Sequence, residues 1–332
     1  MTTYIIRRLL LMLPTMVGIT IMVFAVSRLA PGDPVSLSMG PGGQLDAERA
    51  ADVRKARMEL YGLDKPIPVQ YANWLKRVVT FDFGDSIKHH RPVIELIKER
   101  LPITLALNLI SFVIIYVISI PMGMLAAVRH KKFFDRFSSV LVFVLWSLPV
   151  MLVGQLLIGY FCGPAFVDWF PPAGLSSNDA GTLPFFPWLA DRLWHLVLPV
   201  ICLTYTGFAY LTKQVRAGML ESLRADYIRT ARAKGLSNTT VVFRHAFRNS
   251  IIPIITIMAT LLPAMLGGSV IIERIFSISG MGMLAFEAVT TRDYNVVMAV
   301  ATIAGLMNLV GLLFGDIAYA IADPRVSFEG SV

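Results

Sequence analysis

The feature that most constrains this chain is a series of long apolar segments. The hydrocarbon core of a membrane is about 30 Å thick, and an α-helix needs about 20 apolar residues to cross it. Of the 332 residues, 55% are hydrophobic and only 16% are charged, whereas a soluble domain carries about 25% charged residues. The sequence therefore predicts an all-α membrane protein. Its six transmembrane helices are expected at Leu9–Leu29, Leu105–Val128, Phe137–Cys162, Leu196–Thr212, Ile251–Ile272 and Val296–Ala322.

The Lys and Arg residues concentrate in alternate loops between these segments. Cytoplasmic loops carry an excess of such residues, so both termini are predicted to be cytoplasmic (N-in/C-in). Because the net charge of +8 is accounted for in this way, nucleic acid is not expected as a partner and the lipid bilayer is. The basic residues on the predicted cytoplasmic side are Arg7, Arg8, Arg129, Lys131, Lys132, Arg136, Lys213, Arg216, Arg224, Arg229, Arg232, Lys234, Arg244 and Arg248.

The first apolar segment has two interpretations. Arg7 and Arg8 followed by an apolar run also fit a cleavable signal peptide. The run reaches Leu29, however, which is longer than the usual apolar region of such a peptide, and the small-x-small triplet Ala25–Ser27 lies inside it. We therefore expect a retained first transmembrane helix over residues 1–29.

The long segment at residues 30–100 is predicted to lie outside the cytoplasm, because long translocated loops escape the charge rule. Gln44–Leu60 and Pro66–Phe83 have helical patterns, and the second carries Tyr71 and Trp74. These patterns predict a small helical extracytoplasmic segment; a linker lying on the membrane surface is the alternative. A five-helix membrane core would follow over residues 101–323, and then a short cytoplasmic tail over residues 324–332.

The predicted cytoplasmic loop at residues 213–250 is unusually long and basic. Glu221–Lys234 is predicted to be helical, with an acidic start and a basic end that suit the helix dipole. Gly235 stands where a left-handed residue often ends a helix, and Ser237 or Asn238 can cap a second helix. A basic helical hairpin between two membrane spans indicates a docking surface for a cytoplasmic partner.

The second helix of the hairpin combines charge with apolar side chains. Arg244 and Arg248 are spaced to project together at i,i+4, and Val241 and Phe243 supply apolar contacts. A DNA-binding helix-turn-helix is a rival interpretation, but the position between two membrane spans argues against it. A lipid-headgroup patch is a second rival, which does not explain the second capped helix. It competes for the cations nearest the membrane, Lys213, Arg216 and Arg224.

Several strings in the chain resemble a known family of membrane transporters. DYIRTARAKGL (Asp226–Leu236) and RHAFRNSIIP (Arg244–Pro253) resemble the EAA-type loop of ABC importer permeases of the dipeptide/oligopeptide/nickel group. The resemblance extends over nearly the whole chain. It includes RLAPGDP after the first span, YGLDKPIPVQY and FGDSI in the external segment, RDYNVV before the last span and DPRV after it.

The chain departs from the family pattern at a few positions. Where the family has Glu-Ala-Ala ahead of the glycine of the loop, this chain has Arg229, Thr230 and Ala231, with Gly235 kept. A Ser-Gly pair, Ser279–Gly280, replaces the usual Pro-Gly, and Asn295 stands where proline is common. The last two changes fall in predicted external loops and leave the argument about the hairpin intact.

The resemblance implies a type I ABC importer permease fold in the bacterial inner (plasma) membrane. Two permease subunits, usually two different chains, would form the pore for di- or oligopeptides or related solutes. Two cytoplasmic ATPases would dock on the loops, and an extracytoplasmic solute-binding protein would deliver the substrate. The coupling residues implied are Arg229, Thr230, Ala231, Gly235, Leu236, Val241, Phe243, Arg244 and Arg248.

The chain itself is expected to be neither an enzyme nor a holder of cofactors. It has no Gly-x-x-x-x-Gly-Lys-Ser/Thr phosphate loop, so ATP would be bound by the partner ATPases. Cys162 and Cys202 have no metal-ligand spacing, and the adjacent His89 and His90 in an external segment are expected to be solvated. No metal site is predicted.

Charged residues near membrane depth test the alternative of a stand-alone secondary transporter or channel. Such carriers generally use buried acidic residues, and the centres of the predicted spans lack them. A membrane-embedded enzyme is also disfavoured, because the sequence shows no paired catalytic residues at membrane depth. Glu273 and Arg274, at the outer end of the fifth span, are either an external gate or an interfacial pair. Asp316 is expected to order the cytoplasmic end of its helix. The pattern does not choose among dipeptides, longer peptides, glutathione and nickel chelates.

Overall fold

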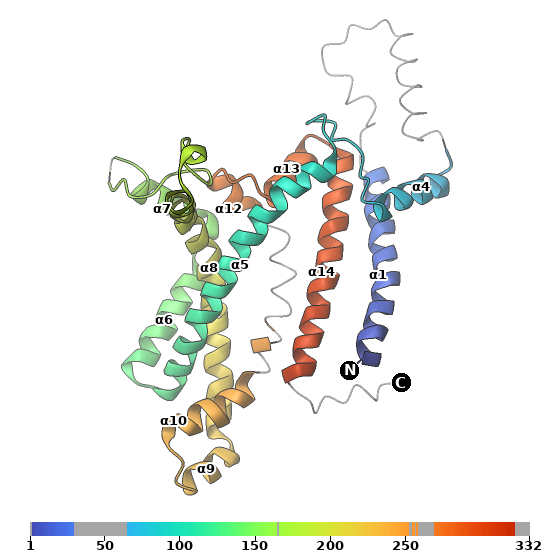
Figure 1. Ribbon diagram of the computed structural model, residues 1–332. Coiled ribbons are helices and arrows are strands. Elements are labelled where there is room, and N and C mark those ends of the chain that lie inside the picture. The colour runs from blue at the N-terminus through green and yellow to red at the C-terminus, as the bar shows by residue number, and fades with distance from the viewer. Residues whose placement is uncertain are drawn as a thin grey trace, which may run out of the picture.

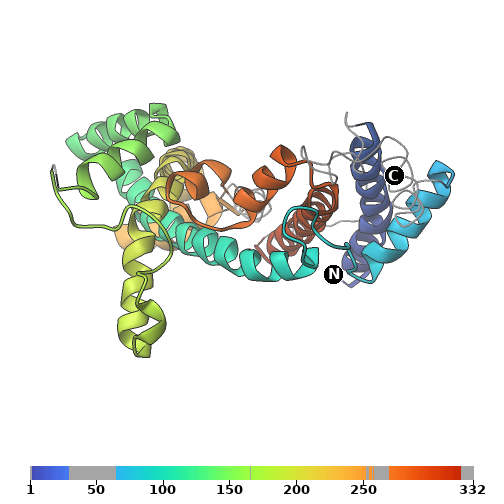
Figure 2. The same ribbon diagram turned by 90° about the horizontal axis from the view of Figure 1, so that it is seen from above.

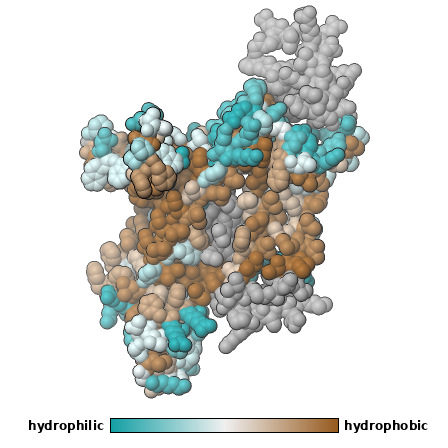
Figure 3. Space-filling view, viewed as in Figure 1, coloured by the Kyte–Doolittle hydropathy of each residue, from teal (hydrophilic) through white to brown (hydrophobic). Residues whose placement is uncertain are grey.

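The computed structural model describes residues 2–29, 65–164, 166–251, 254–255, 257 and 269–322. Within these ranges the chain is helical, with two isolated β-bridges and no strand. The helices extend between two hydrophilic ends, and an apolar band covers the middle of the molecule (Figures 1 and 3). Four helices are long and apolar enough to cross a membrane: α1 (Thr2–Leu29), α5 (Val93–Val128), α8 (Phe185–Arg224) and α14 (Tyr294–Ala322).

The third predicted span is not a straight helix. It consists of α6 (Phe133–Ser147) and α7 (Val150–Phe161), which are bent by 96° relative to one another. Leu148 is extended (φ −82°, ψ 127°), because the residue before a proline is biased away from the α conformation. The prediction of one continuous helix over Phe137–Cys162 is therefore wrong. If this pair is one broken span, the described residues contain up to five spans.

The total of six spans stays a prediction, because most of the fifth one, Ile251–Ile272, lies outside the described residues. So do the predicted helix at Gln44–Leu60 and the tail at residues 324–332.

The fourth predicted span is part of a much longer helix. α8 covers 40 residues, from Phe185 to Arg224, and includes both the end of the predicted external loop and the start of the predicted cytoplasmic one. The predicted bounds, Leu196–Thr212, are too narrow because prolines mark the beginning of α8. Pro184 is the residue before its first turn, and Pro187 lies within that turn, where no N–H partner is lost.

Helices α5 and α8 form the closest pair of long helices, and small residues make this possible. A Cβ atom added to Gly123 of α5 would lie 2.7 Å from the Cβ of Val215 and 2.8 Å from the carbonyl oxygen of Thr212. At Gly207 of α8, an added Cβ would lie 2.6 Å from Cδ1 of Ile115. The two backbones therefore approach each other directly along much of the molecule.

The segment predicted to be external is described from residue 65 onward. The helix expected within Pro66–Phe83 is α4 (Ile67–Val79), whose Tyr71 and Trp74 rings pack on Phe24 of α1 with centroid separations of 5.5 and 5.8 Å. α5 begins at Val93, so the predicted boundary at residue 100 falls inside a helix.

The remaining helices occupy the two ends of the molecule. The short η1 (Ala180–Thr182), α12 (Val270–Ile275) and α13 (Met281–Thr290) lie at the same end as α4 (Figure 1). Seen from above, α1 and α4 are at one edge and α6 and α7 at the other, with α12, α13 and α14 between them (Figure 2). The opposite end carries α9 (Asp226–Ala233), α10 (Asn238–Thr240) and the π-helix η2 (Val241–Phe247).

Helices α1 and α14 pack against each other on one side of the molecule. Arg8 of α1 forms an ion pair with Asp316 of α14, with 2.6 Å between Nε and Oδ2. This pair joins the beginning of α1 to the last turns of α14; the expected role of Asp316 in ordering the end of its own helix stays a prediction.

Candidate functional site

The basic hairpin begins with a break in the chain. The single helix predicted over Glu221–Lys234 is wrong, because α8 ends at Arg224, Ala225 is extended (φ −70°, ψ 151°) and α9 starts at Asp226. An acidic residue is favourable in the first turn of a helix, and Asp226 stands there. The break turns α9 away from the axis of α8 and so begins the hairpin.

The turn of the hairpin has the predicted geometry. Gly235 has φ +78°, a conformation that non-glycine residues seldom adopt. Its N–H donates to the Arg232 carbonyl at 2.9 Å, and the Leu236 N–H donates to the Ala231 carbonyl at 3.3 Å, which satisfies the carbonyls at the end of α9. Ser237 is the cap of the next helix, because its side chain accepts a hydrogen bond from the Thr240 N–H.

The second helix of the hairpin is wound differently from the expectation. Over Val241–Phe247 it is a π-helix, a rare form with i→i+5 hydrogen bonds that is frequent at functional sites. The exposure expected for Val241 does not hold, whereas Arg244 and Arg248 are exposed as expected. Val241, expected to be an exposed apolar contact, is fully buried, whereas Phe243 is 61% exposed.

The inner side of the hairpin is part of the protein core. Its buried apolar side chains pack in one cluster with residues of α5 and α8 such as Met124, Val215 and Met219. The hairpin is therefore seated on the ends of two long helices and does not hang from them as a loose loop. The hairpin residues in this cluster are Ile228, Ala231, Val241, Val242 and Ala246.

The outer side of the hairpin presents most of the predicted coupling residues. Ala231 and Val241 face the interior, and the other seven are exposed: Arg229, Thr230, Gly235, Leu236, Phe243, Arg244 and Arg248. Tyr227, which the sequence reasoning missed, is also 40% exposed. Exposed aromatic and Arg side chains together are typical of the residues that dominate protein–protein interfaces.

A partly buried ion pair fixes the turn between α5 and α6 beside the hairpin. The carboxylate of Asp135, which is 3% exposed, accepts hydrogen bonds from Arg216 Nη2 at 3.0 Å and from the Lys131 N–H at 2.8 Å. The sequence reasoning counted Arg216 among the membrane-proximal cations and overlooked Asp135. A single carboxylate in a strongly basic turn was the signal that could have found it.

At the opposite end, Glu273 and Arg274 are directed to different surroundings. Glu273 is 2% exposed and accepts hydrogen bonds from the Met283 N–H at 2.6 Å and Thr104 Oγ1 at 3.2 Å. Arg274 lies over the Phe286 ring, 5.1 Å from its centroid. The Glu273 side chain therefore ties the start of α13 to α12 and α5.

Glycines make room for this carboxylate. A Cβ atom added to Gly280 would lie 2.5 Å from Glu273 Cδ, and one added to Gly282 would lie 3.1 Å from Oε2. Gly280 is the second residue of the Ser-Gly pair noted in the sequence. Its small size is therefore required by the position of the buried acid.

Two of the strings predicted to be external meet in the structure. Ser86 Oγ of FGDSI donates to Asp293 Oδ2 of RDYNVV at 2.6 Å, and the Lys88 N–H donates to the same oxygen at 3.2 Å. Asn295 Nδ2 donates to the Asp85 carbonyl at 2.8 Å. These contacts join residues 85–88 to the start of α14.

The residues considered for metal binding do not gather into a ligand set. Within the described ranges, no group of three or more His, Cys, Asp or Glu side chains could hold a metal ion. The His89 Nε2 atom lies 3.7 Å from Glu287 Oε2.

Membrane-length helices, with a capped hairpin seated on the ends of two of them, define a multi-pass membrane protein that exposes aromatic and basic side chains at one end. The fold agrees with this class. One chain of the MetNI methionine ABC transporter matches with a TM-score of 0.51 and 16% sequence identity, over 69% of this chain and 97% of that one. At this identity the match shows a shared fold.

The chain belongs to the family of binding-protein-dependent transport system inner membrane components, whose model matches residues 119–328. The N-terminal model of the same transport systems matches residues 1–108. The protein is therefore a multi-pass inner-membrane component of a transport system and not an enzyme, as the resemblance implied.

Relatives match over their full length. The oligopeptide transport system permease protein AppB of Bacillus subtilis is 41% identical over 99% of this chain and 100% of its own. The inner membrane ABC transporter permease protein YejB of Escherichia coli O157:H7 is 36% identical over the same shares. The peptidoglycan transport system permease protein YejB of Agrobacterium fabrum is 36% identical over 99% of each chain.

Proposed function

We propose that this chain forms half of the translocation pore of an ATP-driven importer for di- or oligopeptides or related small solutes. The observation that carries the proposal is the hairpin, which has a buried side fused to α5 and α8 and an exposed side of aromatic and basic residues. The relatives named above for oligopeptide and peptidoglycan transport support this class of substrate.

The proposed topology has six spans with both termini in the cytoplasm. The first turn of α1, the last turn of α14 and the hairpin lie at one end of the molecule, and α4, α12 and α13 lie at the other (Figure 1). Because cytoplasmic loops are rich in Lys and Arg, the end with the hairpin is assigned to the cytoplasm.

The proposed partners follow from the two ends. Two cytoplasmic ATPases, which bind the ATP, dock on the hairpins of this chain and of a second, different permease chain. An extracytoplasmic solute-binding protein delivers the substrate to the end that carries α12 and α13. Energetic coupling requires a structural element with discrete positions that both sites can bias. A hairpin packed into the core of α5 and α8 fits that requirement because it cannot shift without them.

Glu273 and Arg274 support a static role better than a moving gate. The carboxylate is held by hydrogen bonds from two elements, so we propose that it positions the outer helices α12 and α13. The alternative function, a stand-alone transporter or channel, would not explain the hairpin, because such a protein needs no docking surface for an ATPase.

The test is recovery of partner proteins with the tagged chain in a mild detergent. We expect two phosphate-loop ATPases and a second multi-pass permease to co-purify. In the double variant Arg244→Glu/Arg248→Glu the ATPases should be lost while membrane insertion is unchanged. Lys98→Glu, an exposed cation on α5 at the opposite end, is the control and should keep them. Isolation of the wild-type chain alone, under conditions that preserve other complexes, would refute the proposal.

A further inference from the structure

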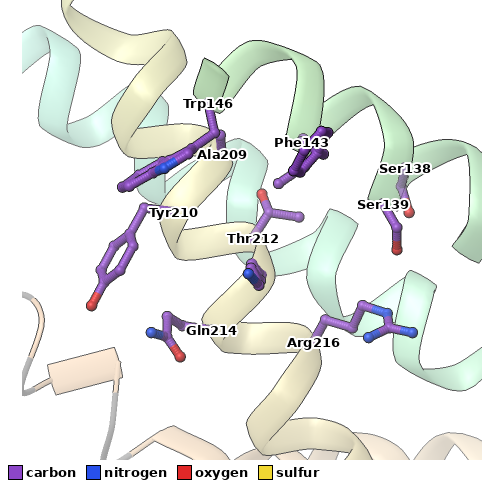
Figure 4. Close-up of a pocket in the computed structure, with 11 residues that line it drawn as sticks. Ser138, Ser139, Phe143, Trp146, Ala209, Tyr210, Thr212, Gln214 and Arg216 are labelled. Carbon is purple, nitrogen blue, oxygen red and sulfur yellow. The ribbon is translucent and has the colours of Figure 1, made fainter.

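A hollow of about 610 Å³ lies between α6 and α8, on the part of the molecule nearest the hairpin. Trp146 of α6 and Tyr210 of α8 stack above it, with ring centroids 5.6 Å apart. Figure 4 shows its division into two parts: Trp146, Phe143 and Ala209 lie at one end, and polar side chains lie at the other. The polar part comprises Ser138, Ser139, Gln214 and Arg216.

The apolar part of the hollow opens onto an apolar surface. Val140, Phe143 and Trp146 of α6 are 62%, 72% and 56% exposed. Exposure of these side chains to water would be unfavourable, so we expect this face of α6 to contact apolar groups. The occupant of the hollow therefore has an apolar body.

The polar part carries cations that lack partners. Arg216 is neutralised by Asp135, but Lys213 and Arg136 form no ion pair with any residue in the described ranges. Lys213 lines the hollow, and Arg136 is three residues before Ser139 and so on the same face of α6. Both are the first charged residues beyond the predicted spans that end at Thr212 and begin at Phe137.

We propose that this hollow binds an anionic phospholipid of the membrane. The acyl chain occupies the space beside Trp146 and Tyr210, and the phosphate headgroup lies between Lys213 and Arg136. The assignment to the cytoplasmic leaflet rests on the topology proposed above. A peptide fits less well, because its backbone amides would need partners along its whole length and the hollow gathers its polar groups at one end.

The test uses the whole complex, exchanged into vesicles of equal parts phosphatidylglycerol and phosphatidylcholine and then extracted in mild detergent. Retained lipid is counted by native mass spectrometry. We expect the wild type to retain phosphatidylglycerol over phosphatidylcholine. One basic residue near a membrane surface contributes about 1 kcal/mol, so Lys213→Gln and Arg136→Gln should each reduce retention about fivefold. Arg7→Gln, an exposed cation at the same end on α1, should not.

A second variant separates the site from general surface charge. Ser139→Trp, at an exposed position on the rim of the hollow, should exclude the lipid without removing a cation. Co-purification of the ATPases in the same samples reports on the proposed function independently. Equal retention in Lys213→Gln and Arg7→Gln, no preference for phosphatidylglycerol in the wild type, or photo-crosslinking of a peptide or the second permease from position 139 would overturn the proposal.

Discussion

The buried carboxylate of Glu273 should control the stability of the outer helix α13, and Glu273→Ala tests this. The substitution removes the acceptor of the 2.6 Å bond from the Met283 N–H and of the 3.2 Å bond from Thr104 Oγ1. A hydrogen bond to a charged group contributes about 1.5–3 kcal/mol, and a buried donor left unsatisfied costs about 1–3 kcal/mol. These effects overlap, so we expect the first turn of α13 to lose about 2–3 kcal/mol of local stability.

Amide hydrogen exchange of the purified complex measures this loss directly. Local opening is governed by its own free energy, and a loss of about 2–3 kcal/mol corresponds to exchange about 30- to 150-fold faster. The effect should be concentrated at Met281–Leu284 and absent from the hairpin. Glu95→Ala is the matched control, because Glu95 forms only an exposed ion pair with Arg91 and should change protection little. Unchanged protection of Met283 in Glu273→Ala would refute the reasoning.

Three further substitutions test other parts of the structure. Gly235→Val should make the hairpin more sensitive to trypsin, because φ +78° costs a β-branched residue at least about 1–2 kcal/mol; Gly235→Asn, which tolerates this conformation, should behave like the wild type. A double-mutant cycle of Asp135→Asn and Arg216→Gln, followed by thermal unfolding, should give a coupling of about 1–2 kcal/mol, and additive effects would contradict the ion pair. Gly123→Ala should destabilise the complex by about 1–3 kcal/mol because the backbone of α8 cannot yield. Gly159→Ala, where an added Cβ meets nothing within 4 Å, is its control, and equal melting of the two would count against the close contact.

Features that depend on local chemistry could be predicted from the sequence. The apolar length of α1, α5 and α14 follows directly from the thickness of a membrane. The left-handed turn at Gly235 and the cap at Ser237 could be predicted because the end of one helix and the start of the next need local hydrogen-bond partners for their backbone groups. Motif resemblance added the family, which the match over residues 119–328 confirms.

Features that depend on contacts between distant segments were missed. The hydropathy of Phe137–Cys162 shows that the segment is apolar. It does not show that Pro149 breaks the helix within it. Asp135 and Arg216 are 81 residues apart, so nothing local reveals their pairing. Val241 was placed on the wrong face because a π-helical winding changes which side chains point inward.

The length of α8 has a mechanical consequence. Helix α8 packs against the hairpin core near one end and carries aromatic residues at the other. Its 40 residues form a continuous rod about 60 Å long. The close contact at Gly207 lies about 33 Å from the Phe185 end of the helix, so a tilt of about 5° about that contact would displace this end by about 3 Å. Because the close glycine contacts with α5 lie near the middle of α8, a small displacement of the hairpin would be transmitted as a displacement of similar size to the opposite end of the molecule.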